Sequence, residues 1–163
     1  MTMMTTSESN DSRRPVLVMG IGNLVLQDEG FGVHAVRRLA EKGVDDRIDL
    51  LVGGTAGLHL MGYLRNYDHV VVIDAALDSY PAGTLRRLRP RYSEFPPLAT
   101  AHEIGLKDVI EALDITGFCP DVELIVCGVK KYTSLGCDLS PEVGSSLDEA
   151  CDMALSAALE KLG

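Results

Sequence analysis

The chain has 163 residues, of which 46% are hydrophobic, and it carries a formal charge of −9 at pH 7. A chain of this length and hydrophobic content can bury the core of one domain without disulfide bonds or a structural metal. Its acidic balance, with no stretch rich in Lys or Arg to offset it, argues against nucleic acid and anionic membrane surfaces as partners.

The polar first 13 residues are expected to form a disordered tail, which leaves residues 14–163 as a single domain. The apolar run Val16-Leu17-Val18-Met19 stops at Gly20, as is typical of a strand buried on both faces in a parallel sheet. Residues 29–42 then place hydrophobic side chains near helical spacing, and this pattern predicts the first helix.

The alternation of strand and helix continues along the middle of the chain. The sequence predicts a strand near residues 48–52, a helix over 56–66 and a strongly β-branched strand over 70–73. A short turn signal at residues 79–83 leads into a further strand at 84–88. So short a connection favours an antiparallel neighbour over a crossover.

The last third of the chain follows the same scheme. After a proline-bearing loop, a helix is expected over residues 104–113, a buried strand over 122–127 and a closing amphipathic helix over 141–162. The whole pattern predicts an α/β fold: a three-layer α/β/α sandwich around a mostly parallel five-stranded sheet with one strand antiparallel.

Export is not expected, although Ser12-Arg13-Arg14 before an apolar stretch superficially resembles a twin-arginine signal. Polar residues 27–29 interrupt the apolar run, and no small-residue cleavage site follows. No apolar stretch reaches the roughly 20 residues that span a bilayer. The four cysteines form no Cys-x-x-Cys pair, so reduced thiols in a cytoplasmic protein are the expected state: Cys119, Cys127, Cys137 and Cys151.

Three titratable residues are expected at one edge of the sheet. Ligands of open α/β sheets bind beyond the carboxyl ends of the strands, where the strand order reverses. Glu29 begins the first helix and Asp74 ends the third strand, so an order beginning 2-1-3 would make their carboxylates converge. His102 precedes a helix that must run antiparallel to the last strand, and therefore begins on the same edge. Mixed oxygen and nitrogen ligands suit a divalent transition metal such as nickel or zinc.

Each of these residues also has a structural interpretation. Glu29 could complement the dipole of the helix that it begins, and Asp74 could form a turn, although burying an unpaired acid is costly. Thr100-Ala101-His102-Glu103 can be a capping box in which the histidine takes no part. The other histidines have no acid arranged around them in the sequence and are expected at the surface: His34, His59 and His69.

A glycine loop connects the second strand to its helix on the same edge. It consists of Gly53, Gly54, Thr55, Ala56 and Gly57. Its glycines allow left-handed backbone and close approach of another chain. The loop is therefore either a plain tight turn or a surface that contacts a bound peptide.

Familiar cofactor and protease motifs fail at single positions. Gly20-Ile21-Gly22 begins like a dinucleotide fingerprint, but position 25 is Val25 and no ribose-binding acid ends the second strand. His102-Glu103 resembles the start of a zincin helix, but the second histidine is replaced by Leu106. Nicotinamide, flavin and zincin chemistry are therefore not expected.

Taken in chain order, these motifs resemble those of the maturation endopeptidases that trim the C-terminal tail of nickel-iron hydrogenase large subunits. The resemblance runs from about Pro15 to the final helix. Besides the glycine loop, it rests on Gly20-Ile21-Gly22-Asn23, Asp28-Glu29-Gly30, Asp68-His69, Ile73-Asp74-Ala75, Pro81-Ala82-Gly83-Thr84, His102-Glu103-Ile104-Gly105-Leu106, Cys127-Gly128-Val129 and Leu139-Ser140-Pro141. Each motif is weak alone, and their order makes the match specific.

The resemblance implies a phosphorylase/hydrolase-like sandwich with endopeptidase activity. It assigns metal binding to Glu29, Asp74 and His102, and substrate contact to the glycine loop. It also implies that nickel arrives with the large-subunit precursor, rather than being held permanently, and serves as the recognition signal. Cys119 and Cys127 fall where the family is variable and receive no role.

The cleavage chemistry is a hypothesis at this point. No serine, cysteine or aspartic dyad is evident in the sequence. We therefore expect Glu29, Asp74 and His102 to engage the substrate's nickel, while a water assisted by the metal or a carboxylate attacks the peptide bond. The alternative is a nickel-binding chaperone that docks on the same precursor without cutting it.

Overall fold

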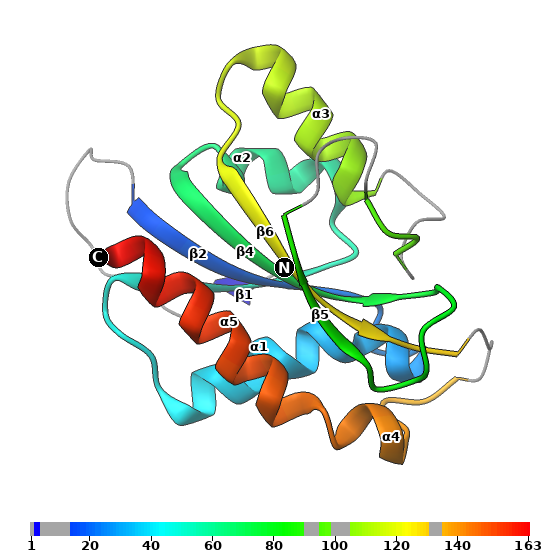
Figure 1. Cartoon of the computed structure of the whole chain (residues 1–163). Helices are drawn as coiled ribbons and strands as arrows, with labels where there is room; N and C mark the ends of the chain where they lie inside the picture. Colours follow the sequence, from blue (N-terminus) through cyan, green and yellow to red (C-terminus); the bar gives the residue numbers. More distant parts are fainter. Residues whose placement is uncertain (1, 4–13, 90–94, 99–104, 131–134) are drawn as a thin grey trace.

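The computed structural model describes residues 2–3, 14–89, 95–98, 105–130 and 135–163, and these form an α/β fold around a central sheet (Figure 1). The sheet has six strands in the order β1-β3-β2-β4-β6-β5. Their bounds are Thr2–Met3 for β1, Arg14–Ile21 for β2, Ile48–Gly54 for β3, Tyr67–Ala76 for β4, Leu85–Leu88 for β5 and Asp121–Gly128 for β6. β3, β2, β4 and β6 are parallel, whereas β1 and β5 lie antiparallel at the two edges. The predicted fold class is therefore confirmed.

Helices cover both faces of the sheet (Figure 1). The long helices α1 and α5 lie on one face, and α2 and α3 on the other. Their bounds are Phe31–Lys42 for α1, Met61–Leu64 for α2, Leu106–Thr116 for α3, Pro141–Gly144 for α4 and Leu147–Leu162 for α5; the short 3-10 helices are η1 at Gln27–Gly30 and η2 at Gly57–Leu60. Among the described residues, no helix has the length and apolar character that crossing a bilayer requires.

Two hydrophobic cores lie on either side of the sheet, and β4 contributes to both. Val71, Ile73 and Ala75 pack toward α1 and α5, whereas Val70 and Val72 pack toward α2 and α3. Because successive side chains of a strand alternate between its faces, a strand buried on both faces must be apolar almost throughout. This explains the continuous hydrophobic run in the sequence.

The structure departs from the sequence prediction at both ends of the sheet. The predicted disordered tail includes Thr2 and Met3, which pair with β3 through backbone groups, a contact that polar composition does not forbid; residues 1 and 4–13 lie outside the described residues. The strand at 85–88 is antiparallel as predicted, but its neighbour is β6 rather than the preceding strand β4, whose two sides are taken by β2 and β6.

The closing helix, predicted as one element, is divided into α4 and α5. The break falls at Ser145 and Ser146, whose hydroxyls donate to the carbonyl oxygens of Glu142, at 2.9 Å, and Gly83, at 2.6 Å. Serine hydroxyls compete in this way with helical backbone bonds, which favours an interruption. The contact with Gly83 also anchors this corner to the turn before β5.

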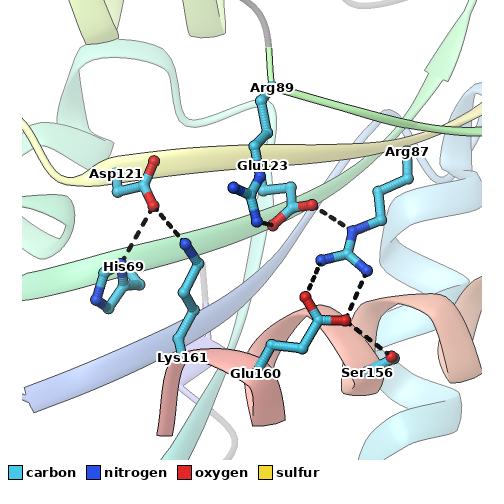
Figure 2. A network of polar contacts seen from close by, with 8 residues as sticks. All are labelled: His69, Arg87, Arg89, Asp121, Glu123, Ser156, Glu160 and Lys161. Atoms are coloured by element: carbon cyan, nitrogen blue, oxygen red, sulfur yellow. Dashed lines mark hydrogen bonds and ion pairs between the residues drawn. The ribbon is translucent and has the colours of Figure 1, made fainter. Parts of the chain in front are cut away.

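A network of ion pairs holds α5 against β5 and β6 (Figure 2). The carboxylate of Glu123 is buried on β6 and accepts hydrogen bonds from Arg87, on β5, and from Arg89. Arg87 also donates to Glu160 on α5, at 3.0 and 2.6 Å. The buried charge of Glu123 is therefore compensated by two guanidinium groups.

The same network continues at the first residue of β6 (Figure 2). Lys161, near the end of α5, donates to Asp121 at 2.8 Å, and this contact holds the pKa of Asp121 below its ordinary value. Nδ1 of His69 lies 3.4 Å from the same carboxylate. The expectation that no acid accompanies His69 was therefore wrong, because pairing of β4 with β6 brings together two residues that are distant in the sequence.

Candidate functional site

The end of β2 and the start of α1 are packed backbone against backbone. A Cβ added at Gly20 would lie 2.0 Å from the carbonyl oxygen of Gly32, and one added at Gly32 would lie 2.1 Å from that of Ile73. Real Cβ atoms essentially never come so close, so only glycine fits at either position. The segment that enters α1 is therefore pressed directly onto the carboxyl ends of β2 and β4.

Glu29 lies in η1, the short helix inside this packed segment. Its N–H donates to the carbonyl oxygen of Leu26 at 3.2 Å, and its own carbonyl oxygen accepts from Asn23 at 3.1 Å. A Cβ added at Gly22 would lie 2.0 Å from that carbonyl oxygen, so glycine is required there also. The residue is half-buried, and η1 contacts β4. The element that carries Glu29 thus adjoins the strand that carries Asp74.

Asp74 is fully buried near the end of β4. Its flanking residues Ile73 and Ala75 belong to the core under α1 and α5, so its side chain points to the opposite face of the sheet. Oδ1 accepts a hydrogen bond from the N–H of Ala75 at 2.7 Å. A buried carboxylate at the end of an apolar strand is costly, and such residues concentrate at functional sites.

The strand order confirms the premise on which the site was predicted. The first three predicted strands, now β2, β3 and β4, lie in the order β3-β2-β4, so the order reverses at β2. Glu29 follows β2 and Asp74 ends β4, and the two strands are neighbours. The structure therefore brings both residues to the reversal point of the sheet.

His102 lies outside the described residues, between 98 and 105. The chain before it passes the end of β4, because the N–H of Leu77 donates to the carbonyl oxygen of Pro97 at 2.7 Å and Leu98 bridges to Ala76. The chain after it enters α3 at Leu106. The position of the histidine itself stays a prediction, but the chain reaches the end of β4 only four residues earlier.

The capping-box interpretation of residues 100–103 does not fit the observed helix. α3 begins at Leu106, and its N-cap is Gly105, whose N–H donates to Oδ2 of Asp108 at 2.9 Å. The returning acid is therefore Asp108 rather than Glu103. His102 precedes the cap by three residues and is not part of it.

The donor set fits a transition metal, although its assembly rests on a residue outside the described part of the chain. Within the described ranges no three His, Cys, Asp or Glu side chains lie close enough to hold a metal ion. Glu29 and Asp74 supply two carboxylates there, and His102 would supply the imidazole. Two oxygen donors and one nitrogen donor suit nickel or zinc better than a hard cation.

Asp28 was not identified from the sequence as a distinct functional group, yet it organises this edge. Its side chain is buried, and Oδ1 accepts a hydrogen bond from the N–H of Ser140 at 2.7 Å. The contact ties the loop before α4 to the segment that carries Glu29. The motif Leu139-Ser140-Pro141 was the available signal, since it was part of the family resemblance without an assigned role.

The glycine loop lies beside the same segment. The N–H of Gly22 donates to the carbonyl oxygen of Gly54 at 3.0 Å, which joins the loop to the end of β2. Gly54 has φ of +56° and Gly57 has φ of +55°, so both occupy the left-handed region that favours glycine. A Cβ at Gly54 would meet only the carbonyl oxygen of Gly22, at 4.0 Å, so the space beyond it is open.

Two of the described cysteines are poor nucleophiles. Burial raises the pKa of Cys127 to about 12 and that of Cys151 to about 11. Because the thiolate is the reactive form, neither is activated at neutral pH. This agrees with a site built on carboxylates.

The chain is similar to proteins that process hydrogenases. The model of the family described as hydrogenase maturation protease matches residues 33–157. The hydrogenase expression/formation protein HupD of Bradyrhizobium diazoefficiens is 36% identical over 163 residues, which cover 96% of this chain and 83% of the relative. The hydrogenase 2 maturation protease of Escherichia coli is 35% identical over 151 residues, covering 89% and 91%.

Solved structures give the same result. The hydrogenase maturating endopeptidase HybD from E. coli superimposes with a TM-score of 0.75 at 35% identity, covering 90% of this chain and 93% of that one. The [NiFe] hydrogenase maturation protease HybD from Thermococcus kodakarensis gives a TM-score of 0.71 at 28% identity, covering 88% and 99%.

Proposed function

Because the chain belongs to the hydrogenase maturation protease family, we propose that it removes a C-terminal tail from the nickel-loaded precursor of a nickel-iron hydrogenase large subunit. Membership of the family makes the chain a peptidase. The nickel, the tail and a cytoplasmic location are the parts that we propose. The precursor brings the nickel with it, so the metal is part of the substrate.

One observation carries the proposal: η1 is packed on the ends of β2 and β4. Only glycine at positions 20, 22 and 32 permits this contact, so the sequence maintains it at the cost of three flexible residues. The result is that Glu29 and Asp74 belong to adjoining elements at the sheet reversal point. This arrangement supports a site in which both carboxylates, with His102, bind the substrate's nickel.

The carboxylates can also take part in the cleavage. A metal bound beside the cleavable peptide bond orients that bond and stabilises the oxyanion that develops on it. A neighbouring carboxylate can accept a proton from the attacking water. We propose that Glu29, which is half-buried, accepts this proton, and that the fully buried Asp74 orients the metal.

A non-proteolytic nickel chaperone was the alternative from the sequence. It would bind the same precursor without changing its mass. The relatives with assigned activity are proteases and endopeptidases, which favours cleavage.

The test is a processing assay with the purified cognate precursor, prepared with and without nickel and analysed by intact-mass spectrometry. Wild-type protein should remove a C-terminal peptide only from the nickel-loaded form. Glu29→Gln, Asp74→Asn and His102→Gln should each remain folded and leave the precursor unprocessed. Glu41→Gln is the matched control, because Glu41 lies exposed near the end of α1. Normal cleavage by all three variants would remove the proposed site, and loss of nickel without cleavage would favour the chaperone.

We also propose that the glycine loop contacts the substrate. Gly54→Asn tests this, since asparagine tolerates the left-handed backbone and its side chain would enter open space. We expect impaired processing with unchanged thermal stability. Gly117→Asn is the control, because Gly117 has φ of +78° and open space but ends α3 at the opposite edge of the sheet. Equal processing by both variants would leave the loop with only a turn-forming role.

A further inference from the structure

Two large aliphatic side chains are exposed on neighbouring loops beside Glu29. Val25, in the loop after β2, is 52% exposed, and Leu135, in the loop before α4, is 79% exposed. Exposed apolar residues scattered singly need no explanation, but adjacent ones at a functional edge indicate a binding surface. We call this pair the apolar ridge.

Backbone hydrogen bonds hold the two loops together at the ridge. The N–H of Gly136 donates to the carbonyl oxygen of Val25 at 2.9 Å, and the N–H of Gln27 donates to the carbonyl oxygen of Gly136 at 2.8 Å. Leu26 and Gly136 thus form a parallel bridge. These bonds place residues 25 and 135 side by side although they are far apart in the sequence.

The ridge is built rigidly rather than left as two loose tips. Gln27 has φ of +50°, a backbone conformation that non-glycine residues rarely adopt, and such strain is concentrated at functional sites. A Cβ at Gly136 would already lie 3.2 Å from Cγ of Gln27, so the two segments are in close contact. The bond from Ser140 to the buried Asp28 fixes the far end of the second loop. A rigid apolar surface loses little conformational freedom when it is covered.

The ridge is continuous with the proposed site. Asn23 and Leu26, which flank Val25, are the residues whose backbones bond to the backbone of Glu29. A protein that brings its C-terminal tail to Glu29 must therefore pass over Val25 and Leu135.

We infer that the apolar ridge is a docking surface for the hydrogenase precursor, and that it contacts an apolar surface of that protein next to the tail. This inference rests on the proposed function, because the position of Glu29 identifies the partner. The side chains of Val25 and Leu135 carry no polar atoms, so the contact is hydrophobic. The precursor's tail engages the metal site and its folded body covers the ridge.

The test uses Val25→Ser, Leu135→Ser and the double variant in the full chain. Ile115→Ser is the control, because Ile115 is 87% exposed near the end of α3, at the opposite edge of the sheet. Thermal stability should stay unchanged, since each replaced side chain is exposed. Processing of the nickel-loaded precursor should show a KM raised about tenfold in the double variant, with kcat near the wild-type value and the control unaffected, since tenfold is a modest loss of uniform binding.

Two results would overturn the inference. The first is a wild-type KM in the double variant. The second is a wild-type KM combined with a change in oligomeric state by light scattering, which would assign the ridge to contact between two copies of this chain. Direct binding of the precursor to the immobilised variants is measured in parallel. If the wild-type chain binds the precursor through the ridge but leaves its mass unchanged, the proposed cleavage fails and the docking surface stands.

Discussion

Replacing Gly32 by alanine tests whether the contact between α1 and the sheet positions the site. The added Cβ would lie 2.1 Å from the carbonyl oxygen of Ile73 and 2.3 Å from that of Ile21. A carbon and a carbonyl oxygen in contact are separated by about 3.3 Å or more. The start of α1 must therefore move away from the sheet by roughly 1 Å, and it carries Glu29 with it.

The magnitude follows from this displacement. Overfilling a packed core costs about 1–3 kcal/mol. In a domain of this size each kcal/mol lowers the Tm by about 2–4 °C, so we expect a fall of about 2–12 °C for Gly32→Ala. A misplacement of about 1 Å can reduce a catalytic rate about 100-fold, so processing should fall by about that factor even when the variant is folded.

The assay measures Tm by circular dichroism and the processing rate at a temperature where the variant is folded. Gly62→Ala is the control, because a Cβ at that exposed position in α2 would meet nothing within 4 Å. It should be neutral, or stabilise by up to about 1 kcal/mol through reduced freedom of the unfolded chain. A Gly32→Ala variant with wild-type Tm and wild-type rate would refute the reasoning that this contact positions Glu29.

Three further substitutions test the packing around the site and the network at the far edge. Asp28→Ala removes the acceptor of the Ser140 N–H and should cost about 1.5–3 kcal/mol in urea unfolding, whereas Asp28→Asn should cost less; equal losses would contradict this. Glu123→Gln removes a buried charge that faces two guanidinium groups, and we expect a loss of about 1–3 kcal/mol, against no change if the network is only decorative. The pKa of Asp148 is lowered to about 2, chiefly by its hydrogen bond from Arg38, so its contribution is complete above pH 4 and is lost as the pH falls toward 2. Asp148→Asn should therefore flatten the fall in stability between pH 4 and 2, and an unchanged pH profile would refute this assignment.

The sequence predicted the elements whose signals are local. The β-branched run 70–73 identified β4, and its alternation with helical patterns predicted the parallel sheet and its layers. The break before α5 was missed because it depends on the hydroxyl of Ser146 reaching Gly83, a contact across the fold. β1 was missed because two residues paired through their backbone leave no hydrophobic pattern.

The site was predicted as far as topology and residue order can reach. The 2-1-3 strand order places Glu29 and Asp74 together, and that order follows from general rules for doubly wound sheets. The contact of Asp28 with Ser140 joins residues 112 positions apart, so no local spacing encodes it. The pairing of His69 with Asp121 was missed for the same reason, since it arises only when β4 and β6 lie side by side.

The central claim is that Glu29, Asp74 and His102 act together on the nickel of a precursor. The most direct measurement is the mass of that precursor after incubation with the wild-type chain, with and without nickel, and with the three isosteric variants. The account predicts loss of a C-terminal peptide only for nickel-loaded precursor with wild-type chain. Cleavage of nickel-free precursor at the same rate, or by all three variants, would contradict it.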